Sequence, residues 1–122
     1  MNDRSHTSTT GAPSARAAAV ARTGAPEYAT VPEVISFYRS RAASPVEVVK
    51  DLLARIDKYE SSLHCFVTLT PELALARARE AEDAFIRGVE ADPLCGIPYG
   101  LKDVIETAGV RTTGQSKILE HN

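Results

Sequence analysis

The 122-residue chain has two cysteines, no tryptophan and only 6% aromatic residues. Cys65 and Cys95 are isolated, and neither belongs to a CxxC pair. Two separate cysteines in a chain of this size do not make a disulfide framework. We therefore expect both thiols to be reduced and mostly buried, in a cytoplasmic protein.

Long apolar runs and an excess of charge of one sign are also missing. No apolar run approaches the roughly 20 residues that span a membrane, and the net charge is only −2, from 14 basic and 16 acidic residues. This balance gives no reason to expect nucleic acid or a membrane surface as a partner. The histidines, His6, His64 and His121, lack a partner histidine or carboxylate pattern, so no metal and no cofactor are predicted.

The N-terminal segment is poor in large apolar side chains. Between Met1 and Pro26, Val20 is the only large aliphatic residue apart from Met1, and the segment is rich in Ser, Thr, Ala, Gly and Arg. Such a composition cannot bury enough apolar surface to offset the entropy of ordering. It also lacks the apolar core of a secretion signal. We predict a disordered tail over residues 1–28, in preference to a targeting peptide.

Three helices are predicted, because three segments begin with a capping signal and continue with apolar residues at helical spacing. The starting segments are Thr30-Val31-Pro32-Glu33, Ser44-Pro45-Val46-Glu47 and Thr70-Pro71-Glu72. The first helix should end at residues 41–43, and Ser61 and Ser62 should end the second. The third should run to Arg87, with Gly88 as its C-cap. The second has an apolar stripe formed by Val48, Val49, Leu52, Leu53, Ile56 and Tyr59.

Two β-rich runs flank the third helix. Residues 64–70 and 96–102 are predicted as strands, the second thinned by glycine and proline. A strand–helix–strand unit whose strands share a sheet makes a right-handed parallel crossover. The order helix, helix, strand, helix, strand therefore predicts an α/β fold.

The second predicted strand ends on a lysine, Lys102. Strand alternation places Pro98, Gly100 and Lys102 on one face, which leaves room for a ligand or another segment beside the amine. A phosphate-binding P-loop is rejected, because Leu101 separates Gly100 from Lys102 and Asp103 stands where Ser or Thr is needed. Three alternatives remain open. Lys102 is a Schiff-base or cofactor lysine, a neutral general base, or an edge lysine that reaches to solvent.

The residues around Lys102 add a longer pattern. They are Pro93-Leu94, then Gly96-Ile97-Pro98-Tyr99-Gly100-Leu101-Lys102-Asp103, then Gly109, Thr112-Thr113 and Ser116. This pattern resembles the opening of the amidase signature family, and the helices upstream agree with it, so the resemblance covers roughly Thr30 to Asn122. The fold implied is a large mixed β-sheet wrapped by helices, of which residues 29–122 would be the truncated N-terminal portion.

The resemblance also implies a chemistry. The family cleaves amide C–N bonds with a Ser–cisSer–Lys triad, in which Lys102 matches the catalytic lysine and would take a proton from the bridging serine. The expected partner is a small-molecule amide, and a homodimer is a further expectation for the full-length form. Both triad serines belong downstream of Asn122, and Ser116 matches a non-catalytic position. The chain is therefore expected to be inactive alone.

Some positions depart from the family pattern or leave alternatives. Gly114-Gln115 stands where Ala-Gly is usual, and Val104 stands where tRNA-dependent amidotransferase A subunits tend to carry Asn, which favours a general amidase. The rival enzyme is the A subunit of a glutamyl-tRNA or aspartyl-tRNA amidotransferase, which works in a complex with ATP, glutamine and tRNA. The rival outside enzymes is a small helical binding module that unfolds cooperatively. Asp103 is predicted to cap the following turn, and Cys95 to be a small buried thiol.

Overall fold

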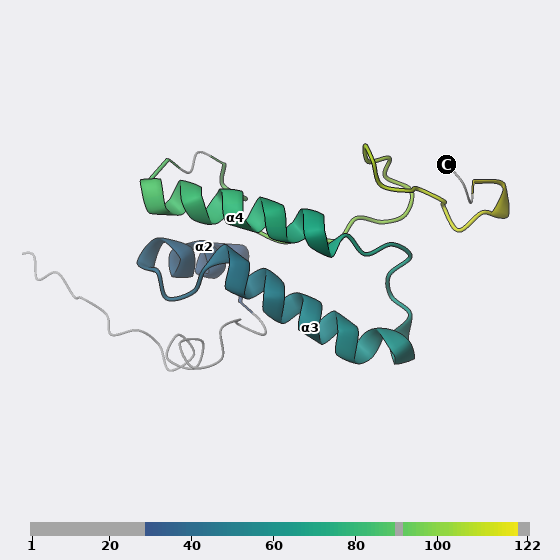
Figure 1. Cartoon of the computed structure of the whole chain (residues 1–122), viewed down its shortest axis with the longest axis horizontal. Helices are drawn as coiled ribbons and strands as arrows, with labels where there is room; N and C mark the ends of the chain where they lie inside the picture. Colours follow the sequence, from purple (N-terminus) through teal and green to yellow (C-terminus); the bar gives the residue numbers. More distant parts are fainter. Residues whose placement is uncertain (1–28, 90–91, 120–122) are drawn as a thin grey trace, which may run out of the picture.

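The computed structural model describes residues 29–89 and 92–119, and its described part is helical (Figure 1). The elements are α2 (Val31–Ser40), α3 (Pro45–Leu63), α4 (Pro71–Arg87) and the short 3-10 helix η1 (Lys117–Leu119). The tail predicted for residues 1–28 lies outside the described residues. None of the described helices is both long and apolar enough to cross a membrane.

Side-chain caps set the starts of α2 and α3. The amide and the hydroxyl of Thr30 both donate to Oε2 of Glu33, at 2.7 and 2.9 Å. At α3, the Ser44 amide donates to Oε2 of Glu47 at 2.9 Å, and the Glu47 amide donates back to Ser44 Oγ at 3.2 Å. These bonds satisfy amides that have no partner within the helix. Both predicted starts are confirmed.

The helix ends are set by residues in the left-handed conformation. Gly88 has φ +66° at the end of α4, as predicted for its C-cap. The prediction that Ser61 and Ser62 end the second helix is wrong, because α3 continues through both to Leu63. His64 then turns the chain with φ +49°, and its amide donates to the Glu60 carbonyl at 2.9 Å.

The core lies where α2 meets α3 and α4. Its buried members are Ile35, Tyr38, Ala43 and Val48, with Val34, Phe37, Leu52, Phe85 and Ile97 packed against them. The rings of Tyr38 and Phe85 meet edge to face, with their centroids 5.3 Å apart. The alanine-rich side of α4 buries Ala78 and Ala81. α4 lies beside α3 and α2 (Figure 1).

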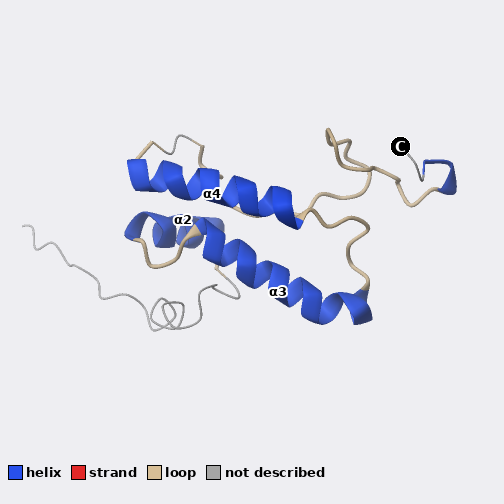
Figure 2. Cartoon of the chain, viewed as in Figure 1, coloured by secondary structure: helices blue, strands red, loops and turns tan. Residues whose placement is uncertain are grey.

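The two predicted strands are loops, and Figure 2 shows no strand in the part of the chain that the structure describes. The only β-type pair there is an isolated antiparallel bridge between Thr107 and Val110. In residues 64–70, Phe66 and Val67 remain exposed over 41% and 46% of their surfaces. A strand needs the backbone groups of a neighbour for its hydrogen bonds, and these two loops do not pair. The predicted α/β sheet is therefore not confirmed.

Candidate active site

The segment that leads to Lys102 is fastened to the helical core at Gly96. The Tyr38 hydroxyl, on α2, donates to the Gly96 carbonyl at 3.1 Å. Gly96 has φ +73°, and a Cβ atom built on it would lie 3.1 Å from Cγ of Pro45 and 3.2 Å from Cβ of Ala81. Only glycine fits both the conformation and the space. Gly96 thus joins all three long helices to the segment before Lys102.

Tyr38 keeps its proton over a wide pH range. Burial raises the pKa of Tyr38 to about 12, and negative charge on the nearby Cys95 adds to this effect. The neutral hydroxyl is the form that donates to Gly96. The pKa of Tyr38 is therefore higher in the folded chain than the value of about 10 in the unfolded chain. The neutral hydroxyl stabilises the fold fully below pH 10, and this contribution is lost as the pH rises toward 12.

Replacing Tyr38 by phenylalanine tests this anchor. The variant keeps the ring contact with Phe85 but leaves the Gly96 carbonyl without its donor, so we expect a loss of about 1 kcal/mol in the free energy of unfolding. Urea unfolding followed by circular dichroism measures that loss. Between pH 10 and 12 the wild-type chain should lose stability faster than Tyr38→Phe. Identical pH curves would mean that the hydroxyl does not hold Gly96.

A compact turn precedes Gly96. The Leu94 amide donates to Oδ1 of Asp92 at 2.8 Å, and the Cys95 amide donates to the Asp92 carbonyl at 3.0 Å. The Ile97 amide then donates to the Leu94 carbonyl at 3.0 Å. This turn directs the chain toward Lys102.

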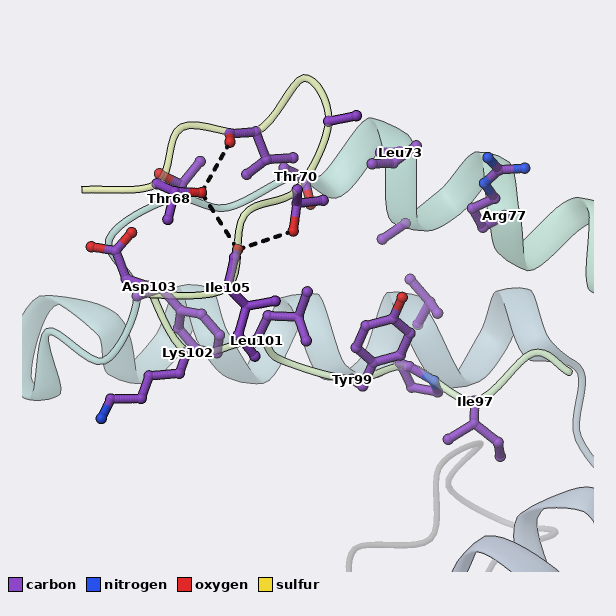
Figure 3. A pocket seen from close by; sticks show the side chains of 18 of the residues that line it. Thr68, Thr70, Leu73, Arg77, Ile97, Tyr99, Leu101, Lys102, Asp103 and Ile105 are labelled. Atoms are coloured by element: carbon purple, nitrogen blue, oxygen red, sulfur yellow. Dashed lines mark hydrogen bonds between the residues drawn. The ribbon is translucent and has the colours of Figure 1, made fainter. Parts of the chain in front are cut away.

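Lys102 is an exposed residue in a turn, and the prediction that it ends a strand is wrong. Its carbonyl accepts from the amides of Val104 and Ile105, at 2.7 and 3.0 Å. In Figure 3 its amine extends away from the Asp103 carboxylate, Thr70 and Leu73. The amine is therefore accessible from solvent and positioned only through its backbone.

The open side predicted beside Lys102 is occupied in part by a neighbouring segment. A Cβ atom on Gly100 would lie 3.9 Å from Cε1 of Phe66, which comes from the loop between α3 and α4. This distance is an ordinary van der Waals contact, so an alanine would also fit at this position. The Phe66 ring is the neighbour of Gly100, but the structure shows no approach so close that it requires glycine.

Asp103 closes the loop that follows the lysine. Its carboxylate accepts from the Thr113 amide at 2.8 Å, from the Thr113 hydroxyl, and from the Gln115 amide at 3.2 Å. Its backbone carbonyl accepts from the Gly114 amide at 2.7 Å. The bonds from Thr113 are the main reason that the pKa of Asp103 is lowered, with smaller contributions from Gln115 and Arg111. The structural role predicted for Asp103 is confirmed, although it caps residues 113–115 and not the next turn.

The loop between Asp103 and Thr113 is ordered by threonine hydroxyls. Those of Thr107 and Thr112 both donate to the Ile105 carbonyl, at 3.3 and 3.4 Å (Figure 3). Val110 bridges back to Thr107, and Gly109 supplies the left-handed turn between them with φ +76°. The family pattern residues Gly109 and Thr112 therefore have local roles in shaping this loop.

An open groove of about 1230 Å³ runs between α4, residues 65–70 and the segment from 92 to 115. Its apolar lining is partly exposed, as at Leu73, Leu94, Tyr99 and Leu101. Lys102 and Asp103 also line it. The groove can accept a small apolar group beside a lysine amine, and within the described ranges no three His, Cys, Asp or Glu side chains are placed to hold a metal ion.

The cysteines differ from their prediction. Cys65 is exposed and Cys95 is half-buried, whereas both were expected to be mostly buried. Cys65 is exposed because residues 64–70 form a loop and no sheet covers them. Both cysteines line the groove.

Sequence reasoning missed the two contacts that fix the lysine segment. The hydroxyl of Tyr38 bonds to a carbonyl 58 positions away, a separation that no local sequence pattern predicts. The bond between Asp103 and Thr113 spans ten positions. The acidic residue and the threonine were both visible in the motif, but no spacing rule pairs them.

Comparison with known proteins shows to which family the chain belongs. The family model named Amidase matches residues 47–122, a range that contains Lys102, Asp103 and Thr113. The chain belongs to the amidase family. The predicted resemblance is therefore confirmed. No solved structure matches the chain.

Several curated relatives similar to the chain carry the name of the A subunit of glutamyl-tRNA(Gln) amidotransferase. The chain is 40% identical to that of Carboxydothermus hydrogenoformans over 94 residues, which is 77% of the chain and 19% of the relative. It is 43% identical to that of Methylococcus capsulatus over 91 residues, which is 75% of the chain and 19% of the relative. The chain thus spans about a fifth of the length of these amidase-family relatives.

Proposed function

We propose that this amidase-family chain supplies the lysine base of an amide-cleaving site, and that residues 29–122 are the N-terminal portion of the amidase domain. The observation that carries the proposal is the family match over residues 47–122, which contains the Lys102 segment. The position of Lys102 in the lining of a groove with apolar side chains supports it. Such a groove can hold the non-reacting part of a small amide.

The proposed chemistry is nucleophilic acyl transfer. Neutral Lys102 accepts a proton from the bridging serine, which in turn accepts one from the nucleophilic serine. The serine oxygen attacks the amide carbonyl, the C–N bond breaks, and the amine leaves with a proton. Water then hydrolyses the acyl-enzyme. Backbone amides would stabilise the oxyanion in both steps.

Ser116 is not proposed as either serine. Its amide donates to the Thr113 carbonyl at 2.9 Å, and its hydroxyl oxygen accepts from the Ile118 amide at 3.3 Å. These bonds give it a local role at the start of η1. Both triad serines would therefore come from outside residues 29–122, and this chain alone would not turn over an amide.

The substrate has two candidates. A general amidase acting on a small amide is the first, favoured by Val104 in place of the Asn that tRNA-dependent A subunits tend to carry. The second is a role as the A subunit of a glutamyl-tRNA(Gln) amidotransferase, favoured by the name of the relatives. The first predicts a protein acting alone or as a homodimer, and the second predicts a complex with other subunits. A cytoplasmic location is proposed for both.

The test uses the product of the chromosomal gene, tagged at its N-terminus and purified from its own cell. Ammonia release is measured from glutamine, propionamide and benzamide, and light scattering gives the mass of the purified species. Ammonia release from simple amides by a monomer or homodimer supports the role as a general amidase. Ammonia release from glutamine by a complex that forms glutaminyl-tRNA(Gln) supports the role as an amidotransferase subunit. No ammonia from any of these substrates, with or without glutamyl-tRNA(Gln), overturns the proposal.

A further inference from the structure

Lys102 is followed directly by the most heavily bonded polar residue of its segment. The Asp103 carboxylate accepts three hydrogen bonds, two from Thr113 and one from the Gln115 amide. The Asp103 carbonyl accepts a fourth, from Gly114. Bonds to an ionised carboxylate are shorter and stronger than bonds between neutral groups. They fix the backbone at the position next to the lysine.

Thr113 is placed to make this contact well defined. It is buried, with 6% of its surface exposed. Its hydroxyl donates to Asp103 and also accepts from the Gln115 amide at 3.1 Å. A buried hydroxyl with both a donor and an acceptor role has one favourable orientation. It therefore holds Asp103 in one rotamer more firmly than exposed bonds would.

The lysine segment is fixed at both ends. Gly96 is held by Tyr38 and by its close fit against Pro45, and Asp103 is held by Thr113. The six residues between them carry Tyr99 and Leu101 along the groove and end at Lys102. Any release of Asp103 frees the end of the segment that carries the amine.

We propose that Asp103 and Thr113 form a latch that positions Lys102 for proton transfer. This inference rests on the proposed role of Lys102 as the base. Neither latch residue touches the reacting atoms in this scheme, so both are positioning residues. The latch acts on the lysine through the backbone bond between positions 102 and 103.

The electrostatics of the latch keep it closed at neutral pH. The Thr113 bonds, the Gln115 amide and the positive charge of Arg111 lower the pKa of Asp103. The pKa of Asp103 is thus lower in the folded chain than the value of about 3.9 for an unfolded chain. The hydrogen bonds of the ionised carboxylate therefore stabilise the fold above about pH 3.9, and this stabilisation is lost as the pH falls through the folded-state pKa. The latch therefore opens only in acid, well below the pH at which a lysine base works.

Thr113→Val tests the latch, because valine keeps the shape of threonine and removes the hydroxyl. In the tagged chromosomal gene product we expect kcat per active site to fall about 10- to 100-fold, the scale of a displacement of about 1 Å in a catalytic group. KM should stay within about twofold, since substrate contacts are unchanged. Thr113→Ser, which restores the hydroxyl, should recover most of kcat. Ser40→Ala, which removes an exposed hydroxyl at the end of α2 away from the groove, is the control and should leave kcat unchanged.

The outcomes separate the latch from the proposed function. Active sites are counted by the acyl-enzyme burst, so that a loss of folded protein does not pass for a loss of kcat. If Thr113→Val yields too little protein, Asp103→Asn is measured in its place, with the same expected fall. A wild-type kcat in these variants overturns the latch if Lys102→Met is inactive. A fully active Lys102→Met overturns the role of the lysine itself.

Discussion

Replacing Lys102 by methionine should lower kcat of the chromosomal gene product by about 10⁴- to 10⁶-fold, the scale on which single members of catalytic triads act. Methionine keeps the length of the side chain and removes the amine. Without a base, the bridging serine has no acceptor for its proton, and the nucleophilic serine stays a neutral hydroxyl. KM should change little, because the amine is proposed to transfer protons and not to bind the substrate. Ammonia release in the steady state measures both constants.

The matched control is Lys50→Met on α3. Both lysines are exposed and both variants remove one amine, but Lys50 lies away from the groove. Lys50→Met should therefore keep its activity within about twofold, as expected for a surface substitution. Activity lost equally in both variants would indicate a general effect of charge. Activity kept in Lys102→Met would show that the amide chemistry uses another base.

The starts of the helices were predictable from sequence because their causes are local. The bonds between Thr30 and Glu33 and between Ser44 and Glu47 each span three residues, so the spacing alone predicts them. The end of α3 was missed, since two serines within a helix cost little when the chain beyond them finds its own cap. His64 adopts the left-handed conformation and provides that cap.

The strands could not be predicted reliably, because β structure depends on neighbours distant in sequence. Residues 64–70 and 96–102 have the composition of strands, and the structure holds both as loops. Their backbones have no partner strand in the described part of the chain, so no ladder forms. The amino-acid composition of these segments predicted that they could form strands, but without a partner strand they remain loops.

The lysine itself was predictable from its motif, whereas its surroundings were not. The motif singled out Lys102, and the match to the amidase family agrees with the resemblance on which that choice depended. The exposed position of Lys102 and its two fixed flanks come from tertiary contacts. Tyr38 and Thr113, which make those contacts, carry no sequence signal of a bond to Gly96 or Asp103.

Replacing Gly96 by alanine should destabilise the helical core by about 2–5 kcal/mol. Part of this loss is backbone strain, since φ is +73° and a side chain there costs about 1–2 kcal/mol. The rest is crowding, for which about 1–3 kcal/mol is usual in a packed core. The new methyl group would meet Pro45, which is fully buried, and Ala81, which is 7% exposed. Neither neighbour can move aside without displacing a helix.

Gly88→Ala provides the control that separates strain from crowding. Gly88 has a similar φ of +66°, but a Cβ atom there would find no heavy atom within 4 Å. It should therefore cost only the strain, about 1 kcal/mol. Urea unfolding followed by ellipticity at 222 nm compares the two variants with the wild-type chain. A larger loss for Gly96→Ala supports the close fit between Pro45 and Ala81, and equal losses would mean that the segment leading to Lys102 is not seated between α3 and α4.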